Sequence, residues 1–231
     1  MKADTKPFQD ELLETTAAID MRSHPFVAAL AKGVLPRDAL RRYTIDLYLL
    51  AYFFPQRLAA LAAMCDDAEA RAELLRNLLE EDGIVGIDGE RLIRDPERSH
   101  GAIARRLCLA AGATDDDLDR ARAAYRRDTW VDRSIASGAL AAALAYLTVG
   151  IEGCVAATFP LLLPMLEQQY GFSRHDLEFV ALHATADAKH ARIGAALTAS
   201  VVRSDDDRAA ALEGAARAAT AWWWWHRSFV R

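Results

Sequence analysis

The sequence predicts an all-α fold in which helices form a bundle, and three observations support this. The chain is rich in Ala, Leu, Arg and Asp and has few runs of β-branched residues, a composition that favours helices. Apolar residues recur at helical spacing between capping residues and terminal Gly or Pro. We recognise no pair of strands, no internal repeat, no Gly-rich phosphate loop and no Gly-x-Ser-x-Gly motif. At 231 residues the chain is long enough for one large core, so we treat residues 1–231 as a single domain.

Charge and cysteine usage exclude several classes of protein. The formal net charge is -5 and no block of Lys and Arg stands alone, which argues against a nucleic-acid partner. The three cysteines have no C-x-x-C spacing, as expected for free thiols in a reducing compartment. Residues 1–20 alternate charged and apolar side chains and lack the apolar core of a signal peptide. We therefore expect a cytoplasmic protein without a membrane partner.

Three helices are expected in the N-terminal part. Thr5 can cap the first, which reaches Met21, and a short second helix over residues 26–32 stops at Gly33. Pro36 starts a long helix over residues 37–65. The inner side of this helix is aromatic and consists of Tyr43, Tyr48, Tyr52, Phe53 and Phe54. Such stripes are most often core, although a tyrosine beside an oxidising metal can be a redox partner.

The next helix, over residues 68–82, ends at Gly83 in the manner of a C-terminal glycine. Its last turn holds Glu80 and Glu81, two acids that oppose the helix macrodipole. A local rule that is broken without evident gain tends to mark function. Residues 84–97 then resemble an irregular loop, and His100 enters a helix that reaches residue 111.

The apolar segment over residues 139–159 is expected to be the central helix of the bundle. Before it, Thr114 and three Asp cap a helix through residue 130. The central segment continues into a Pro-interrupted helix, and together they are long enough to span a membrane. Pro160, Pro164 and a carboxylate, Glu152, interrupt the apolar run. We therefore interpret it as a buried helix of a globular protein.

Two further helices complete the chain. Ser173 and Asp176 form a variant capping box that opens the first. Ser204 and three Asp cap the second, which ends in the four tryptophans of residues 222–225. Four successive Trp cover every side of a helix. We expect two of them to dock on the bundle and the others to contact a partner subunit, which predicts a homodimer.

The first of these helices carries a strip of potential metal ligands. His183, Asp187 and His190 are spaced i, i+4 and i+7, so they project from one face within a sector of roughly 60°. Small alanines flank them, and Gly194 continues the face where another helix could approach closely. The alternative is a set of hydrogen-bonded core histidines and surface polar groups.

Glu152 strengthens the metal interpretation, because a lone carboxylate in an apolar helix needs a cation. The alternative cation is an arginine, for example Arg57 or Arg105. The residues of ligand type comprise three carboxylates and three imidazoles: Glu81, His100, Glu152, His183, Asp187 and His190. Such sets on facing helices are typical of paired iron or manganese ions, whereas zinc takes fewer ligands.

These residues carry a resemblance to a known family. Glu81, or the competing Glu80, is followed by Gly83 and, after a loop, by His100; Glu152 lies in a central apolar helix; and the closing His-x3-Asp-x2-His motif begins at His183. In this the chain resembles the heme-oxygenase-like diiron oxidases and oxygenases, including CADD-like and UndA-like enzymes, which are related to the TenA and PqqC proteins. The resemblance covers roughly residues 40–200.

The resemblance implies a heme-oxygenase-like (TenA/PqqC-like) helical bundle with two Fe(II)/Fe(III) ions per chain, or Mn as the alternative, and O2 as cosubstrate. The substrate would be a small organic molecule, expected to bear a carboxylate, or an internal tyrosine, and an external reductant could take part. The candidate tyrosines are Tyr43, Tyr48, Tyr52 and Tyr146. Some members use a further Glu on the aromatic helix, where this chain has Phe54-Pro55-Gln56-Arg57.

Two other functions remain open. A TenA-like aminopyrimidine hydrolase would use the acidic, aromatic segment that begins at Asp46, with Cys154 as nucleophile. A nonenzymatic interaction protein would instead bind a partner through residues 222–225. Neither requires a metal, so metal content distinguishes them from a diiron enzyme.

Overall fold

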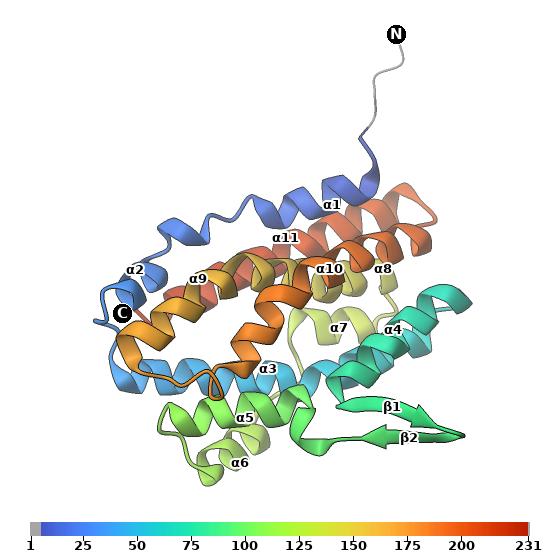
Figure 1. Ribbon diagram of the computed structural model, residues 1–231. Helices are drawn as coiled ribbons and strands as arrows, with labels where there is room; N and C mark the ends of the chain where they lie inside the picture. The colour runs from blue at the N-terminus through green and yellow to red at the C-terminus, as the bar shows by residue number, and fades with distance from the viewer. Residues whose placement is uncertain (1–5, 231) are drawn as a thin grey trace.

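A computed structural model describes residues 6–230, and it has the all-α fold that the composition predicts. Most of the bundle consists of α3 (Arg37–Met64), α9 (Glu152–Tyr170), α10 (Glu178–Val201) and α11 (Asp205–Arg227) (Figure 1). The remaining helices are α1 (Phe8–Ala17), η1 (Met21–Ser23), α2 (Pro25–Ala31), α4 (Ala68–Glu81), η2 (Pro96–Arg98), α5 (His100–Ala110), α6 (Asp115–Ala124), α7 (Trp130–Ala136), α8 (Leu140–Leu144) and η3 (Ala145–Ile151). Thr5, the expected cap of the first helix, lies outside the described residues.

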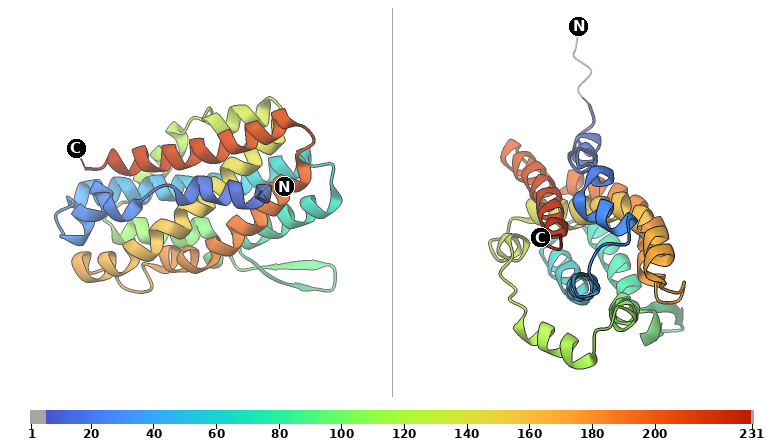
Figure 2. Two further views of the ribbon diagram at one scale, coloured as in Figure 1. Left: turned by 90° about the horizontal axis from the view of Figure 1, so that it is seen from above. Right: turned by 90° about the vertical axis from the view of Figure 1, so that its left-hand side faces the viewer.

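The central helical segment, residues 140–170, lies between two layers of helices. Helices α4 and α5 pack against α3, while α10 packs along α9 and η3. Helix α11 covers η3 and α8, and α1 lies across both α10 and α11. Figure 2 shows the segment that carries α6 and α7 arching away from the rest of the bundle on one side.

The segment over residues 84–97 forms a β-hairpin, so the expectations of an irregular loop and of no strand pair are wrong. Strand β1 (Ile84–Asp88) pairs antiparallel with β2 (Arg91–Arg94), and the hairpin projects beyond the bundle (Figure 1). Gly89, with φ +60°, is the first of the two residues that connect Asp88 to Arg91, a position where two-residue hairpin turns need a positive φ. Neither strand has a buried face, so the sequence lacks the alternation that identifies most strands.

The helix expected over residues 114–130 is divided into α6 and α7. Tyr125 has an extended backbone and ends α6. Thr129 then accepts a hydrogen bond from the backbone N–H three residues on and opens α7 with its own capping box. At the next predicted box, Ser173 and Asp176 do bond to each other, but α10 begins only at Glu178.

Helices α8, η3 and α9 form one continuous helical segment over residues 140–170, with Pro160 and Pro164 inside it. The middle part, η3, is a π-helix, a form that is frequent at functional sites. This segment and α3 are both long and apolar enough to cross a membrane by length and composition alone. Core helices of globular proteins pass the same test, and 72% of the most apolar window in residues 140–170 is buried.

Close packing of α10 against η3 depends on Gly194, as its position in the sequence predicts. A Cβ atom at Gly194 would lie 2.4 Å from the carbonyl oxygen of Thr148, a distance that real Cβ atoms do not reach. Any larger residue would therefore push α10 away from the central helix. Since α10 carries three predicted ligands and the central helix carries Glu152, Gly194 sets the spacing between them.

Candidate metal centre

The first pair of predicted ligands meets where α4 ends and α5 begins. Glu81 is the last residue of α4 and His100 is the first of α5, and both are buried. Between them, Gly83 has φ +74°. A Cβ there would lie 2.5 Å from the Asp95 carbonyl oxygen and 2.7 Å from the Ser99 nitrogen. Glycine therefore allows the hairpin to return tightly enough to place His100 against Glu81.

The contact between Glu81 and His100 has the geometry of two ligands of one metal. Oε2 of Glu81 lies 2.7 Å from Nδ1 of His100, yet this nitrogen has no well-aligned hydrogen-bond acceptor among residues 6–230. Ligand atoms that share an ion are about 3 Å apart when bonds of about 2.1 Å meet at right angles. Burial lowers the pKa of His100, but the charge and hydrogen bonding of Glu81, together with the charges of Asp187 and Glu80, outweigh it and raise the pKa overall. A cation between the two side chains would replace that proton.

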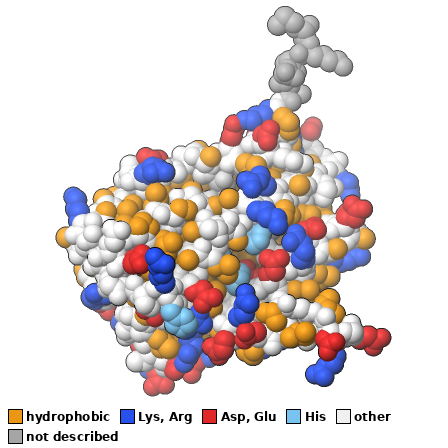
Figure 3. All heavy atoms as spheres, in the orientation of Figure 1, with side chains coloured by type: hydrophobic (Ala, Val, Ile, Leu, Met, Phe, Trp, Pro, Cys, Tyr) orange, Lys and Arg blue, Asp and Glu red, His pale blue; other side chains and the backbone are white. Residues whose placement is uncertain are grey.

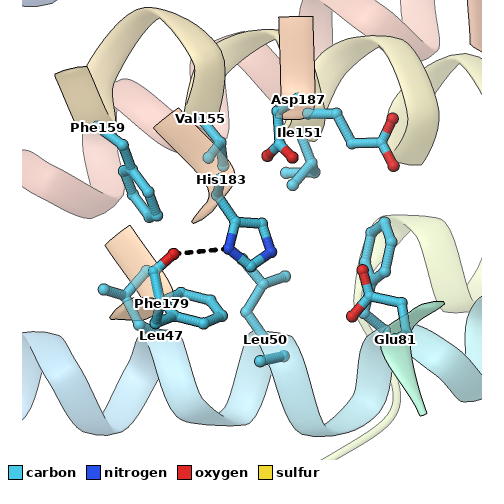
Figure 4. Close-up of a pocket in the computed structure, with 12 residues that line it drawn as sticks. Leu47, Leu50, Glu81, Ile151, Val155, Phe159, Phe179, His183 and Asp187 are labelled. Atoms are coloured by element: carbon cyan, nitrogen blue, oxygen red, sulfur yellow. Dashed lines mark hydrogen bonds between the residues drawn. The ribbon is translucent and has the colours of Figure 1, made fainter. Parts of the chain in front are cut away.

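His183 completes a three-residue cluster with this pair. Its Nδ1 lies 2.7 Å from the carbonyl oxygen of Phe179, one turn earlier in α10 (Figure 4). If Nδ1 donates this bond, Nε2 keeps its lone pair and is oriented for a metal. One ligand atom each from Glu81, His100 and His183 lies within 4.8 Å of the others. This cluster is the densest concentration of ligand atoms in the described chain.

Glu152 is buried beside this cluster without a cation. Asn77 donates a hydrogen bond of 3.1 Å to its Oε1, while Oε2 has no partner in the part of the chain that the structure describes. Burial, reinforced by the nearby Asp187 carboxylate, raises the pKa of Glu152 well above its ordinary value. Burial therefore favours the protonated form of this side chain, and its unpartnered oxygen is available to a cation.

Neither arginine that could have neutralised Glu152 does so. Arg57 is buried and binds Asp132 through two nitrogens, at 2.9 and 3.0 Å. Arg105 forms a surface ion pair with Asp115. The arginine alternative for Glu152 is therefore wrong, and the carboxylate requires another explanation.

Asp187 and His190 lie one and two turns beyond His183 on α10. Asp187 is buried, and its Oδ1 is 3.6 Å from Nδ1 of His190. The other ring nitrogen of His190 is 3.6 Å from Oε2 of Glu80. The two adjacent acids at the end of α4 thus serve different sides: Glu81 faces His100, and Glu80 faces His190.

Two small cavities divide the site, and Glu152 borders both. The first, of about 30 Å³, is also lined by Glu81, His183 and Asp187; the second, of about 20 Å³, is also lined by Asn77, Glu80 and His190. Each could hold one or two atoms of the size of water or a metal ion. In the space-filling view, imidazole atoms reach the surface over α10 with acidic side chains beside them (Figure 3). All six predicted ligands are thus brought to one place.

Apolar side chains close the first cavity on the side away from the ligands. Figure 4 shows Leu50 projecting from α3 toward the His183 ring, with Phe159 and Phe179 on the other side. Further lining residues are Leu47, Ala51, Phe54, Ile151 and Val155. A dry wall of this kind strengthens electrostatic interactions inside the site and limits side reactions with water.

None of the tyrosines proposed from the sequence lines the first cavity. Tyr43 is buried one turn before Leu47 on α3, in an aromatic cluster where its ring stacks on Trp225. Tyr48 faces Tyr52, whose ring contacts Arg122 on the outside. Tyr146, in η3, lines a neighbouring compartment instead.

The features of the hydrolase and interaction alternatives lie elsewhere too. Cys154 is buried away from the cavity, and burial raises the pKa of its thiol to about 12, which disfavours the thiolate nucleophile. In the acidic segment of α3, Leu47 rather than Asp46 borders the cavity. Among the four tryptophans, Trp222 is buried, and Trp224 is the one that is mostly exposed.

Sequence reasoning missed Asn77 and the role of Glu80. Asn77 lies four residues before Glu81, hence on the same face of α4, and this spacing was the available signal. The Phe179 carbonyl could not be foreseen, because every helical residue carries one.

Comparisons with known proteins agree with this geometry. The sequence profile of a family described as iron-containing redox enzymes matches residues 41–223. A 4-aminobenzoate synthase of Chlamydia muridarum is 29% identical over 202 residues, covering 86% of this chain and 80% of its own. A protein of the same name from Nitrosomonas europaea is 26% identical over 206 residues, covering 81% and 76%.

The fold also agrees with a solved structure. A TenA homologue from Pseudomonas syringae pv. tomato superposes with a TM-score of 0.74, covering 96% of this chain and 91% of that one, at 15% sequence identity. The expected TenA/PqqC-like helical fold is therefore confirmed.

Proposed function

Because the chain belongs to the family of iron-containing redox enzymes, we propose that it is an oxidase or oxygenase that binds two irons and uses O2 to oxidise a small organic molecule. The observation that carries the proposal is the buried cluster of Glu81, His100 and His183, with Glu152 beside it and unpaired. Carboxylate-rich sets with imidazoles on facing helices suit two irons.

The ligands divide into two groups around Glu152. Glu81, His100 and His183 would hold one iron, and Asp187 and His190 would hold the other. Glu152 borders both cavities, so it would help to hold the metal in either of them. Bound in this way, the iron pair would supply electrons for the reduction of O2.

The side chains around the ligands have separate tasks. The Phe179 carbonyl fixes the His183 ring, and the Asn77 amide fixes one oxygen of Glu152. Glu152 would bind a cation as the carboxylate, because a positive charge beside it lowers the pKa that burial raises. Phe159 and Leu50 exclude water from the reacting face.

We infer that the substrate is an external molecule rather than a tyrosine of the chain. The relatives are named 4-aminobenzoate synthases, but Tyr43 and Tyr48 do not border the first cavity. Tyr146 lines the adjoining compartment, and Tyr52 lines a separate compartment that reaches Glu81, but neither borders the first cavity. The walls that face the ligands are leucine, isoleucine, valine and phenylalanine.

Oxygen consumption by the iron-loaded protein tests the proposal. We expect uptake of O2 by the wild type with Fe(II) and a reductant, and none by His183→Ala. His175→Ala is the matched control, since His175 is exposed at the start of the same region and should leave uptake unchanged. Full uptake by His183→Ala would refute the assignment.

A further inference from the structure

A larger compartment lies between α3, η3 and α11, next to the metal site. Its volume is about 320 Å³, which is within the range of small-molecule sites. Figure 2 shows the arch between α6 and α7 standing away from α3 and α11 on this side. The lining residues are Asp46, Leu49, Leu50, Tyr125, Tyr146, Ile151, Ala221, Trp222 and Trp225.

This compartment and the first metal cavity lie back to back. Leu50 and Ile151 line both of them, so these two apolar side chains form the partition. The metal cavity itself, about 30 Å³, is too small for an organic molecule. A substrate that lies in the compartment would therefore face the ligands across Leu50 and Ile151.

Each aromatic wall of the compartment is held in place. Tyr125 stacks on Phe53 with ring centroids 4.4 Å apart, and its hydroxyl accepts a hydrogen bond of 2.8 Å from Arg57. Tyr146 stacks on Trp130 at 5.3 Å. Walls that are already fixed cost little ordering entropy when a ligand binds.

The two tryptophans of the wall are fixed as well. The Trp222 indole N–H donates to the hydroxyl of Thr158 at 3.0 Å. The Trp225 indole N–H donates to Oδ2 of Asp46, also at 3.0 Å. The ring centroids of Trp222 and Trp225 lie 5.1 Å apart with the ring planes tilted by 49°, so the two indoles are adjacent in the wall.

The acidic group of the compartment is a carboxylate that remains exposed to solvent, and partial desolvation raises its pKa. Asp46 is its one carboxylate, and no Lys or Arg of residues 6–230 lines it. The cation that acts on Asp46 is Arg42, one turn earlier on α3, which is itself near Asp38 at 3.4 Å. Arg57, behind Tyr125, is neutralised by Asp132. Aromatic faces around a carboxylate are a good environment for an ammonium group.

A different compartment on the other flank of α3 suits the opposite charge. It has a volume of about 400 Å³, reaches Glu81, and is lined by Gln56 and by the guanidinium-bearing Arg94 of β2. The carboxylate-bearing substrate expected from the sequence would find its cation there. The compartment beside Asp46 thus favours a positively charged ligand, and the compartment beside Arg94 favours a negatively charged one.

We propose that the compartment lined by Asp46, Trp222 and Trp225 binds the substrate, and that the substrate is an organic amine with an apolar or aromatic body. The ammonium group lies at Asp46 against the indole faces, and the body faces the metal ligands across Leu50 and Ile151. This assignment rests on the proposed function in treating the occupant as the substrate.

Calorimetric titration with three probes of similar shape tests the proposal: 2-phenylethylamine, 2-phenylethanol and 3-phenylpropionate. Each is titrated into the Fe(II)-loaded protein without O2, so that no turnover occurs, and into the metal-free protein. We expect the amine to bind at least about tenfold more tightly than the other two. Asp46→Asn should abolish this preference, whereas Asp66→Asn, a change at an exposed carboxylate just beyond the end of the same helix, should leave it intact.

A second variant tests the location of the probe. Ala221 is exposed at the edge of the compartment, so Ala221→Trp should fill the space without disturbing the core, and the amine should no longer bind. Equal binding of the three probes, unchanged amine binding in both variants, or tighter binding of 3-phenylpropionate that depends on Arg94 would overturn the proposal. Amine binding by a protein that takes up no iron would leave the ligand class standing and refute the proposed function.

Discussion

Replacement of Gly83 by alanine is expected to damage the metal site without changing any ligand. Gly83 has φ +74°, and an added Cβ would lie 2.5 Å from the Asp95 carbonyl oxygen and 2.7 Å from the Ser99 nitrogen. Both neighbours are backbone atoms, so the return of the hairpin must shift to make room. His100 directly follows Ser99 and would move away from Glu81.

The magnitude can be worked out against a control in the same hairpin. Gly89 has φ +60° and no atom within 4 Å of an added Cβ, so Gly89→Ala adds only the backbone strain of about 1–2 kcal/mol. Gly83→Ala adds a similar strain and a steric overlap of about 1–3 kcal/mol. We expect Gly83→Ala to lower the free energy of unfolding by about 2–5 kcal/mol, and Gly89→Ala by less than half of this.

Metal affinity separates the two variants further. Displacing a ligand by loss of its support typically weakens metal binding about 10–100-fold, which we expect for Gly83→Ala and not for Gly89→Ala. Urea denaturation of the metal-free proteins and anaerobic Fe(II) titration measure the two effects. Equal stability and equal iron affinity of the two variants would refute the idea that Gly83 positions His100.

Three further predictions concern charge and surface. Burial raises the pKa of Glu152 above its ordinary value of about 4.5, so above that pH the folded metal-free protein binds more protons than the unfolded chain. Its free energy of unfolding should therefore fall as the pH rises from about 4.5 through the pKa of the folded state. Glu152→Gln should flatten this pH dependence and stabilise the metal-free protein at neutral pH by about 1–3 kcal/mol. The variant should also lose the stabilisation that Fe(II) gives the wild type. Thermal melts in which the metal-free variant is less stable than the wild type would contradict this. Asp132→Asn leaves Arg57 buried without its partner and should cost about 3–5 kcal/mol in urea denaturation, while an altered iron content would show that the pair also serves the metal site. Trp224→Ser should change the free energy of unfolding by no more than about 0.5 kcal/mol, and should dissociate the homodimer that we predict; a dimer that persists in sedimentation would place its interface elsewhere.

Much of the fold could be predicted because local signals and global packing agree. The long helix from Arg37 and the helix that ends at Gly83 lie within a residue of their expected bounds. The close approach at Gly194 also follows from its lack of a side chain. The hairpin could not be predicted from periodicity, because both faces of its strands are exposed.

The candidate site likewise has one part that the sequence predicts and another part that depends on tertiary packing. His183, Asp187 and His190 share one helix, so helical geometry alone places them together. The meeting of Glu81 with His100 depends on a hairpin of tertiary origin, and the sequence offered only the motif. Which of Glu80 and Glu81 faces His100 depends on the phase of α4 relative to α5, and the structure selects Glu81.

The sequence contains no signal that distinguishes between the two candidate substrate compartments. The compartment beside Asp46 is built from α3, η3, α11 and the arch before α7, four segments that are distant along the chain. No local pattern brings Tyr125 and Trp225 to the same space. Their joint placement is visible only once the helices are packed.

The number of irons that the chain binds tests the central claim most directly. Metal-free protein is titrated with ⁵⁷Fe(II) under anaerobic conditions and exposed to O2, and the product is examined by Mössbauer spectroscopy. The proposed ligand set predicts about two irons per chain in a magnetically coupled pair. One isolated iron per chain, or no iron above background, would contradict it.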